Sequence, residues 1–374
     1  MKRFSTVVKK TLLDPIQLGP YNLKNRLVMA AMTRCRADPK TCVPNDLHVQ
    51  YYSERAEDCG FVLTECSGVS RGGNSFPGGC GIWNDEQTEG WKRVCDAVHK
   101  VNGRIYLQIW HGGRASRKAV TGEVPVAPSA IPFRTPGKDG NPVNSETPLE
   151  LTEDGIKKIL DEFARGAQNA LKAGFDGLEL HGANGYLIDQ FLRDCSNKRT
   201  DQYGGSIENR CRFPLMVIDA LTSVFGADKV GIKATPVGRY QDMFDSNPIP
   251  LYTYLFNELS KRKISFVELG RGPDDLVGKS YYDVKELDQV PDTYKTFRPT
   301  FNGVLIGNSK FNFEEANKLI GDNQVDMVSF GRPYISNPDL AKRFQNGWPL
   351  AQPNMKTAYG GKHEGYTTYP KYQY

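Results

Sequence analysis

Short apolar runs alternate with longer amphipathic segments eight times along this chain of 374 residues. Each apolar run is nearly continuous, as expected for parallel strands that are covered on both sides. We predict strands over residues 26–31, 61–65, 104–109, 175–181, 229–234, 264–269, 303–306 and 325–330. We predict helices over residues 46–58, 86–101, 152–173, 206–225, 250–263, 313–320 and 338–346, and the interval 281–297 has the weakest helical pattern.

Eight strand–helix repeats predict a (β/α)8 TIM barrel. The alternative is an open doubly wound sheet, which would carry a G-x-G-x-x-G turn after its first strand. Here the first strand leads instead into Ala31-Met32-Thr33-Arg34. We therefore expect one α/β barrel domain over residues 1–374, since barrels of this length form single domains.

Composition excludes several function classes. The chain has 48 basic and 43 acidic side chains, a net charge of +5, and its basic residues are dispersed, which argues against nucleic-acid binding. None of the eight cysteines forms a C-x-x-C pair, so no zinc or iron–sulfur site is expected. No run is long enough for a membrane span and no secretory signal is present, which predicts a cytoplasmic protein.

Two segments do not fit a plain barrel. Residues 119–151, after the third strand, are rich in Pro, Gly, Ser and Thr. Long loops of this kind are usually lids or excursions, so we expect an insertion with a small hairpin over the active-site face. The tail after Gly347 is rich in Tyr and Gly. We expect it to fold back over the barrel mouth.

The carboxyl ends of barrel strands face one cavity, and here they carry mainly neutral hydrogen-bonding groups. The fourth strand ends in His181, Asn184 and Tyr186, although a polar surface loop is the alternative for these three. The other ends supply Thr33, Cys66, Gln108, Trp110 and Lys233, and Glu65 is the only carboxylate at a strand end. One carboxylate serves neither a metal nor a glycosidase pair. The set favours recognition of a polar heterocycle.

The last two strand ends fit a phosphate. Barrel phosphate sites form after strands seven and eight from glycine turns. Gly307-Asn308 and Gly331-Arg332 stand at these positions, and an arginine binds phosphate bidentately. A structural ion pair is the alternative role for Arg332.

At this point the sequence resembles a known family. The runs from His181 to Phe191 and from Asn197 to Arg210 look like the old yellow enzyme family of FMN-dependent NADPH dehydrogenases and ene-reductases. The resemblance continues through Gln108–Arg114 and Phe330–Arg332, and it covers nearly the whole chain. Thr33 places it with the longer, classical group, because shorter relatives carry cysteine there.

The resemblance implies an FMN-containing barrel that NADPH reduces and that passes the hydride to an activated alkene by a ping-pong route. His181 and Asn184 would bind the substrate carbonyl and Tyr186 would donate a proton. The residues that would contact FMN are Ala31, Met32, Thr33, Cys66, Gln108, Lys233, Gly307, Asn308, Gly331 and Arg332. The residues that would line the substrate pocket are Phe76, Trp110 and Tyr366, and no metal is implied.

Three positions depart from the family pattern. Lys233 stands where many relatives have arginine, so a point charge replaces a planar fork. Ala31 replaces a common proline, and Cys66 stands where glycine or alanine is frequent. These changes bear on the reduction potential and the rate, and none removes a catalytic group.

Two other functions stay open from the sequence. A dienoyl-CoA-type reductase shares this barrel but adds iron–sulfur cysteines, which this chain lacks. A flavin-binding protein without catalysis is the other, and the presence of His181, Asn184 and Tyr186 argues against it. The expected partners are NADPH and a small enone or other electrophilic alkene, and the chain would be a monomer or a homodimer.

Overall fold

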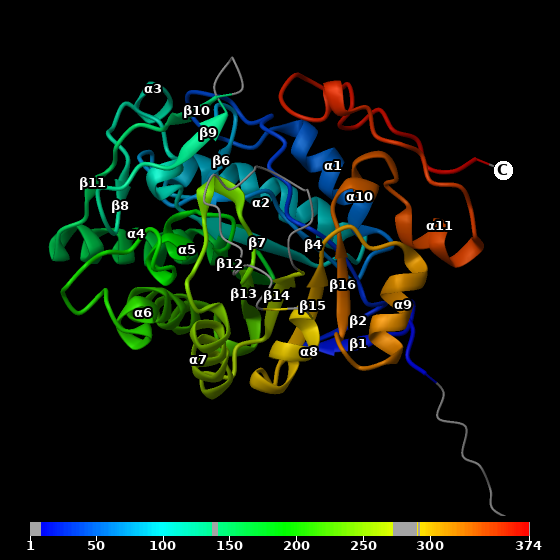
Figure 1. Cartoon of the computed structure of the whole chain (residues 1–374). Helices are drawn as coiled ribbons and strands as arrows, with labels where there is room; N and C mark the ends of the chain where they lie inside the picture. The colour runs from blue at the N-terminus through cyan, green and yellow to red at the C-terminus, as the bar shows by residue number, and fades with distance from the viewer. Residues whose placement is uncertain (1–8, 137–140, 272–289, 291, 374) are drawn as a thin grey trace, which may run out of the picture.

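Eight parallel strands close into a barrel in the computed structural model, which describes residues 9–136, 141–271, 290 and 292–373 (Figure 1). In chain order they are β3 (Leu27–Met29), β4 (Phe61–Leu63), β7 (Ile105–Trp110), β12 (Gly177–Gly182), β13 (Val230–Ala234), β14 (Phe266–Gly270), β15 (Val304–Asn308) and β16 (Met327–Phe330). β12 pairs with β7 and β16 with β3, so the ring is closed. All eight predicted strands are confirmed to within two residues at each end.

Helices cover the outside of the barrel, and the seven predicted ones are present. They are α1 (Asp46–Ala56), α2 (Asp85–Lys100), α4 (Glu153–Ala173), α6 (Ile207–Phe225), α7 (Pro248–Lys261), α9 (Phe313–Gly321) and α11 (Leu340–Asn346). Thr152 caps α4 by accepting a hydrogen bond from the Gly155 amide, and Gly174 ends it with φ 90°. The interval 281–297 lies mostly outside the described residues, and its described end forms the short helix α8 (Thr293–Phe297).

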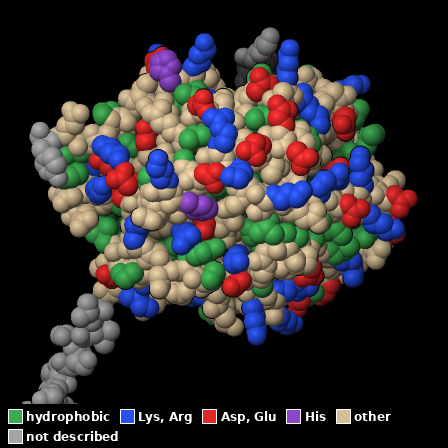
Figure 2. Space-filling model, turned by 180° about the vertical axis from the view of Figure 1, so that it is seen from behind, with side chains coloured by type: hydrophobic (Ala, Val, Ile, Leu, Met, Phe, Trp, Pro, Cys, Tyr) green, Lys and Arg blue, Asp and Glu red, His purple; other side chains and the backbone are tan. Residues whose placement is uncertain are grey.

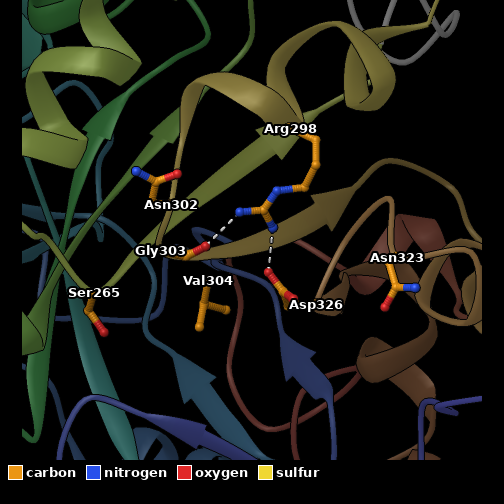
Figure 3. A pocket seen from close by; sticks show the side chains of 7 residues that line it. All are labelled: Ser265, Arg298, Asn302, Gly303, Val304, Asn323 and Asp326. Carbon is orange, nitrogen blue, oxygen red and sulfur yellow. Dashed lines mark hydrogen bonds and ion pairs between the residues drawn. The ribbon is translucent and has the colours of Figure 1, made fainter.

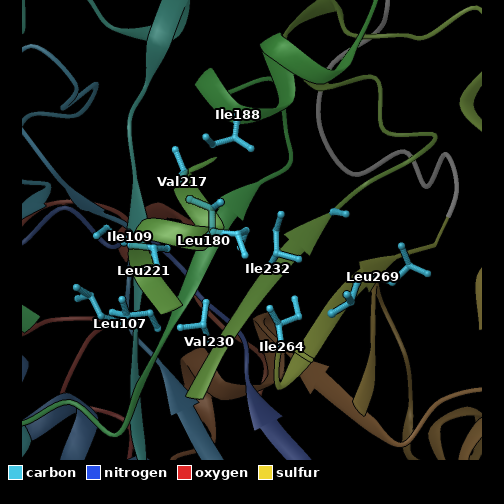
Figure 4. Packing of buried hydrophobic residues seen from close by; sticks show 14 of the residues in the cluster. Leu107, Ile109, Leu180, Ile188, Val217, Leu221, Val230, Ile232, Ile264 and Leu269 are labelled. Carbon is cyan, nitrogen blue, oxygen red and sulfur yellow. The ribbon is translucent and has the colours of Figure 1, made fainter. Parts of the chain in front are cut away.

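Side chains that point outward from the strands pack against these helices. Leu180 of β12 and Ile232 of β13 pack toward Val217 and Leu221 of α6 (Figure 4). Because side chains alternate along a strand, this outward set leaves Glu179, His181 and Lys233 on the inner face.

The inner face has an apolar lower layer at the amino-terminal end of the strands. This lower layer consists of Val28, Phe61, Tyr106, Phe266, Ile306 and Met327. Gly231 makes room for it, because a Cβ there would lie 2.4 Å from the Phe266 ring. The hairpin of β1 (Ile16–Leu18) and β2 (Tyr21–Leu23) closes this end, with Leu18 and Leu23 packed on the layer. The bottom of the barrel is therefore a packed core.

The insertion after the third barrel strand is folded. β8 (Val126–Ala127) pairs with β11 (Leu149–Glu150), and β9 (Arg134–Pro136) pairs with β10 (Pro142–Asn144) as an antiparallel hairpin. An ion pair of 2.7 Å between Arg134 and Asp242 joins the hairpin to the loop after β13. The expected hairpin is confirmed, and Figure 1 shows it at the end of the barrel opposite β1 and β2.

The carboxy-terminal tail lies at the same end of the barrel (Figure 1). The buried Arg34 guanidinium, just after β3, donates to the backbone carbonyls of Ala358 and Gly365. Arg36 donates to the carbonyls of Thr357 and Glu364. The predicted return of the tail to the barrel mouth is confirmed.

The surface mixes charges of both signs. On the face in Figure 2, Lys and Arg side chains stand beside Asp and Glu, and apolar side chains are scattered between them. Within the described part of the chain, no helix combines the length and apolar character that crossing a membrane requires.

Candidate active site

The register of the strands assembles a polar layer directly above the apolar one. Lys233 of β13 stands beside His181 of β12 on one side and Glu268 of β14 on the other. Gln108 of β7 is opposite Glu179 of β12. We call Gln108, Glu179, Lys233, Glu268 and Ser329 the upper layer, and all five are buried.

The upper layer contains two carboxyl groups that the inventory of strand ends did not include. Glu65 was identified as the only carboxylate at a strand end, whereas Glu179 and Glu268 are both fully buried inside the barrel. Glu179 lies three residues before the end of β12, and Glu268 lies two residues before the end of β14. A search limited to the last residues of each strand therefore misses both. The signal was present as a single Glu inside each of two apolar runs, because a carboxyl in a strand covered on both sides needs a partner.

The predicted catalytic segment leaves β12 through a sharp turn. Asn184 has φ 58° and Gly185 has φ 74°, and a Cβ on Gly185 would lie 2.8 Å from Met243. The Asn184 amide donates to the Thr235 hydroxyl at 3.2 Å. Tyr186 then stands at the N-terminus of α5 (Leu187–Leu192). This turn holds His181, Asn184 and Tyr186 at one end of the barrel, and the burial of His181 and Tyr186 argues against the alternative of a polar surface loop.

An aromatic cluster stands around Tyr186. The Trp110 ring, at the end of β7, meets Tyr186 edge-on at 4.7 Å and stacks on Phe76 at 5.7 Å. Phe133 of the insertion and Tyr240 of the loop after β13 pack against the same cluster. The structure thus brings the predicted residues Phe76 and Trp110 to Tyr186. Sequence reasoning missed Phe133 and Tyr240, because both come from long loops.

Two of the candidate catalytic side chains, His181 and Tyr186, are uncharged near pH 7. Burial, with a smaller effect of Lys233, lowers the pKa of His181 to about 3, so the imidazole is uncharged. Its Nδ1 and the Trp110 Nε1 are buried and have no hydrogen-bond partner among the described residues. Burial also raises the pKa of Tyr186 well above its usual value, and a hydrogen bond joins its hydroxyl to Tyr240. Unpaired buried polar atoms of this kind can offer hydrogen bonds to a bound group.

The end of β3 and the loop after β4 form another side of the candidate site. Ala31, Met32 and Thr33 are half-buried, and Cys66 is buried. The Thr33 Oγ1 and the Cys66 Sγ are 2.7 Å apart. Burial raises the pKa of the Cys66 thiol well above its usual value, so the thiol stays protonated.

The residues predicted to bind phosphate lie close together at the ends of β15 and β16. Asn308 and Ser329 are paired in the β15–β16 register, and the Asn308 amide donates to the Ser329 hydroxyl at 2.7 Å. Arg332 is exposed at the start of α10 (Arg332–Ser336), and no ion pair to it is found within the described ranges. The alternative role of Arg332 as a structural ion pair is therefore not supported. Gly307, Asn308, Gly331 and Arg332 share one end of two adjacent strands.

Tyr366 and His111 both pack within the protein. Tyr366 is fully buried, stacked on Tyr51 at 4.0 Å and edge-on to His48 at 5.8 Å. Its hydroxyl has no partner among the described residues, and its place in a substrate pocket stays a prediction. His111 accepts a hydrogen bond from the Gly113 amide, and burial lowers its pKa to about 4. These contacts favour a structural role for His111.

The described residues hold one group of three possible metal ligands, His48, Glu65 and Cys80. The His48 Nδ1 accepts a hydrogen bond from the Asn45 backbone amide. The His48 Nε2 lies 3.6 Å from the Cys80 sulfur, within hydrogen-bonding distance, and 3.3 Å from a Glu65 carboxylate oxygen. These contacts account for the positions of the three side chains.

A surface pocket lies at the opposite end of the barrel. Ser265, Gly303 and Val304, just before or at the start of β14 and β15, line it with Arg298 and Asp326 (Figure 3). The guanidinium of Arg298 is held by Asp326 at 2.6 Å and by the Gly303 carbonyl. This pocket is therefore separate from the carboxyl ends of the strands.

Comparisons with known proteins agree with the site. Residues 11–351 match the family described as NADH:flavin oxidoreductase / NADH oxidase. The chain is 39% identical over 362 residues to a putative 12-oxophytodienoate reductase 2 of Oryza sativa subsp. japonica, covering 96% of this chain and 93% of that one.

Two solved structures share the whole fold. A structure of morphinone reductase in complex with tetrahydroNAD has a TM-score of 0.87 and 40% identity, covering 97% of this chain and 98% of its own. The old yellow enzyme homologue from Zymomonas mobilis has a TM-score of 0.89 and 36% identity, covering 96% of this chain and 99% of its own.

Proposed function

The chain belongs to the old yellow enzyme family of FMN-dependent oxidoreductases, and we propose that it uses NADPH to reduce the double bond of α,β-unsaturated carbonyl compounds, and of nitroalkenes, by a ping-pong route. The observation that carries this proposal is the neutral, buried His181 close to Asn184 and Tyr186 and beside Lys233 on the neighbouring strand. FMN, when bound, takes up a hydride from the nicotinamide and delivers it from N5 to the β-carbon of the alkene.

The residues at the barrel mouth fit FMN. Lys233 offers a buried ammonium group, as a flavin edge that gains negative charge would require. Thr33 and Gln108 offer hydrogen bonds, and Ala31, Met32 and Cys66 offer a mostly apolar surface for a flat ring. The glycine turns and Arg332 supply donors for a phosphate. These residues would hold the cofactor at the barrel mouth.

His181 and Asn184 would orient the substrate. A neutral imidazole and a carboxamide each donate one N–H to the carbonyl oxygen, which polarises the double bond and stabilises negative charge developing on that oxygen. Protonated imidazole is not needed, and the low pKa of His181 keeps it neutral over the physiological range. The ring centroids of Tyr186 and His181 are 4.9 Å apart, with the two rings edge to face. Both side chains therefore face the same small volume.

Tyr186 would supply the proton. Its raised pKa keeps the phenol protonated, and a phenol can transfer its proton to the α-carbon as hydride reaches the β-carbon. The hydrogen bond to Tyr240 offers a route for replacing that proton. Trp110 and Phe76 would confine the substrate, with Phe133 of the insertion closing the pocket from above.

The experiment is an anaerobic two-step titration of the purified yellow protein. NADPH should bleach the flavin band, and cyclohexenone added afterwards should restore it. NADH, used in parallel, measures the nicotinamide preference. A protein that takes up no FMN, or whose reduced flavin is not reoxidised by the enone, contradicts the proposal.

A further inference from the structure

Two carboxyl groups share the interior of the barrel with one ammonium group. Glu179 on β12 and Glu268 on β14 are both fully buried, and Lys233 lies on β13, the strand between them. The Lys233 Nζ is 3.3 Å from the Glu268 Oε2. Two carboxylates beside one ammonium would leave a net negative charge away from water, which costs several kcal/mol.

Hydrogen bonds fix the positions of both carboxyls. Gln108 donates to the Glu179 Oε1 at 2.7 Å, and Ser329 donates to the Glu268 Oε1 at 2.5 Å. Among the described residues, the Oε2 atoms of both glutamates are buried and accept no hydrogen bond. Each carboxyl shifts the pKa of the other, and two carboxyls that share one site retain one proton between them.

That proton belongs to Glu179. Burial, and then the negative charge of Glu268, raise the pKa of Glu179 well above its usual value. Burial acts to raise the pKa of Glu268 too, but Lys233 and the donated hydrogen bonds outweigh it and leave that pKa lowered. The pair with Lys233 is thus neutral overall: a carboxylic acid, a carboxylate and an ammonium group.

The groups around the pair do not otherwise hold charge. Gln108 and Ser329 are neutral donors from β7 and β16. His181 on β12 is an uncharged imidazole, because its pKa is lowered to about 3. The Tyr294 phenol of α8 donates to the carbonyls of Leu269 and Asn308, and burial raises its pKa above its usual range. Lys233 is therefore the one cation facing the pair among the described residues.

We propose that the Glu179–Glu268 pair takes up one proton from solvent each time the bound FMN is reduced by two electrons, and releases it on reoxidation. This inference rests on the proposed function, in which Lys233 would face the flavin edge that gains negative charge. The nicotinamide or another donor supplies the hydride, and the flavin gains one negative charge. The Glu268 carboxylate then binds a proton from water and becomes a second carboxylic acid.

The physical cause is competition for Lys233. In the oxidised protein, the ammonium group neutralises Glu268 alone. New negative charge on its other side repels the carboxylate through a medium of low dielectric constant, where like charges interact strongly. Protonation of Glu268 removes that repulsion and leaves Lys233 paired with the reduced cofactor.

The test is the pH dependence of the reduction potential of the FMN-loaded protein, from about pH 5 to about pH 9. Each proton coupled to a two-electron change contributes about 30 mV per pH unit, since a tenfold change in equilibrium constant is 29.6 mV. We expect a window with twice the one-proton slope. A one-proton slope over the whole range overturns the inference.

A matched variant identifies the proton acceptor. The double variant Glu179→Gln/Glu268→Gln keeps the shape and the acceptor oxygens for Gln108 and Ser329, and it should show the one-proton slope throughout. If the steeper window persists, the proton goes elsewhere, and the assignment is wrong.

A second measurement needs no variant. The reduced-minus-oxidised infrared difference spectrum of the wild-type protein should gain the carbonyl band of a protonated carboxyl group within the same pH window. A spectrum without that gain overturns the inference. Protein that binds FMN and reduces enones but takes up a single proton contradicts only this inference, whereas protein that binds no FMN overturns the proposed function as well.

Discussion

The two layers inside the barrel differ although the same strands supply both. Tyr106 and Phe266 of the lower layer lie two residues before Gln108 and Glu268 of the upper layer. The lower layer is apolar and closed by a hairpin, so it contributes stability. The upper layer is a hydrogen-bonded network near the carboxyl ends of the strands, and we propose that it serves binding and chemistry. A shift of two positions along a strand therefore separates the two roles.

The largest expected effect tests the lower layer. Phe266→Ala removes a fully buried ring that packs against Phe61 and Tyr106. We expect a loss of about 3–5 kcal/mol in the free energy of unfolding, because the cavity cannot close fully. Urea unfolding measures this loss, and the variant that remains folded should still bind FMN. A loss below about 1 kcal/mol would mean that the layer is not a core.

Tyr186→Phe tests the upper end of the barrel. The phenylalanine keeps the edge contact with Trp110 and removes only the hydroxyl. We expect enone turnover to fall about 100-fold, the lower limit for loss of a general acid, while reduction of the flavin by NADPH is unchanged. Stopped-flow measurement of each half-reaction separates them. Equal rates of enone reduction in both proteins would exclude Tyr186 as the proton donor.

Arg332→Ala tests the phosphate end, with Arg298→Ala as its counterpart at the bottom of the barrel. Loss of a charged hydrogen bond to phosphate should weaken FMN binding by about 1.5–3 kcal/mol, or roughly 10- to 140-fold. Quenching of FMN fluorescence gives the dissociation constant. Arg298→Ala breaks the pair with Asp326 but should leave FMN affinity unchanged. The same loss in both variants would contradict the assignment.

The smallest effect concerns pH. His111 has a pKa of about 4 in the folded chain, below the value of about 6.5 expected when unfolded. Below pH 6.5 the unfolded chain binds a proton that the folded chain does not, so stability falls by about 1.4 kcal/mol per pH unit down to about pH 4. His111→Gln should remove this contribution, seen as a smaller difference in unfolding free energy between pH 7 and pH 5.5. Identical pH dependence in both proteins would contradict it.

The sequence predicted the barrel because its strands and helices follow local periodicity. The helix over residues 152–173 and the strand ends at His181 and Trp110 were found in the same way. Glu179 and Glu268 were not recognised as a pair, because their proximity depends on strand register. Tyr240 and Phe133 were missed because loop conformation, set by contacts such as Arg134–Asp242, brings them to Tyr186.

Phenol titration of the oxidised, FMN-loaded protein tests the central claim most directly. A phenolate that is hydrogen-bonded by His181 and Asn184 and stacked on the flavin gives a long-wavelength charge-transfer band. We predict this band in the wild-type protein and its loss or strong weakening in His181→Ala, with FMN still bound. Absence of the band from the wild type, or a band of equal strength and affinity in the variant, would contradict the placement of flavin and substrate at the upper layer.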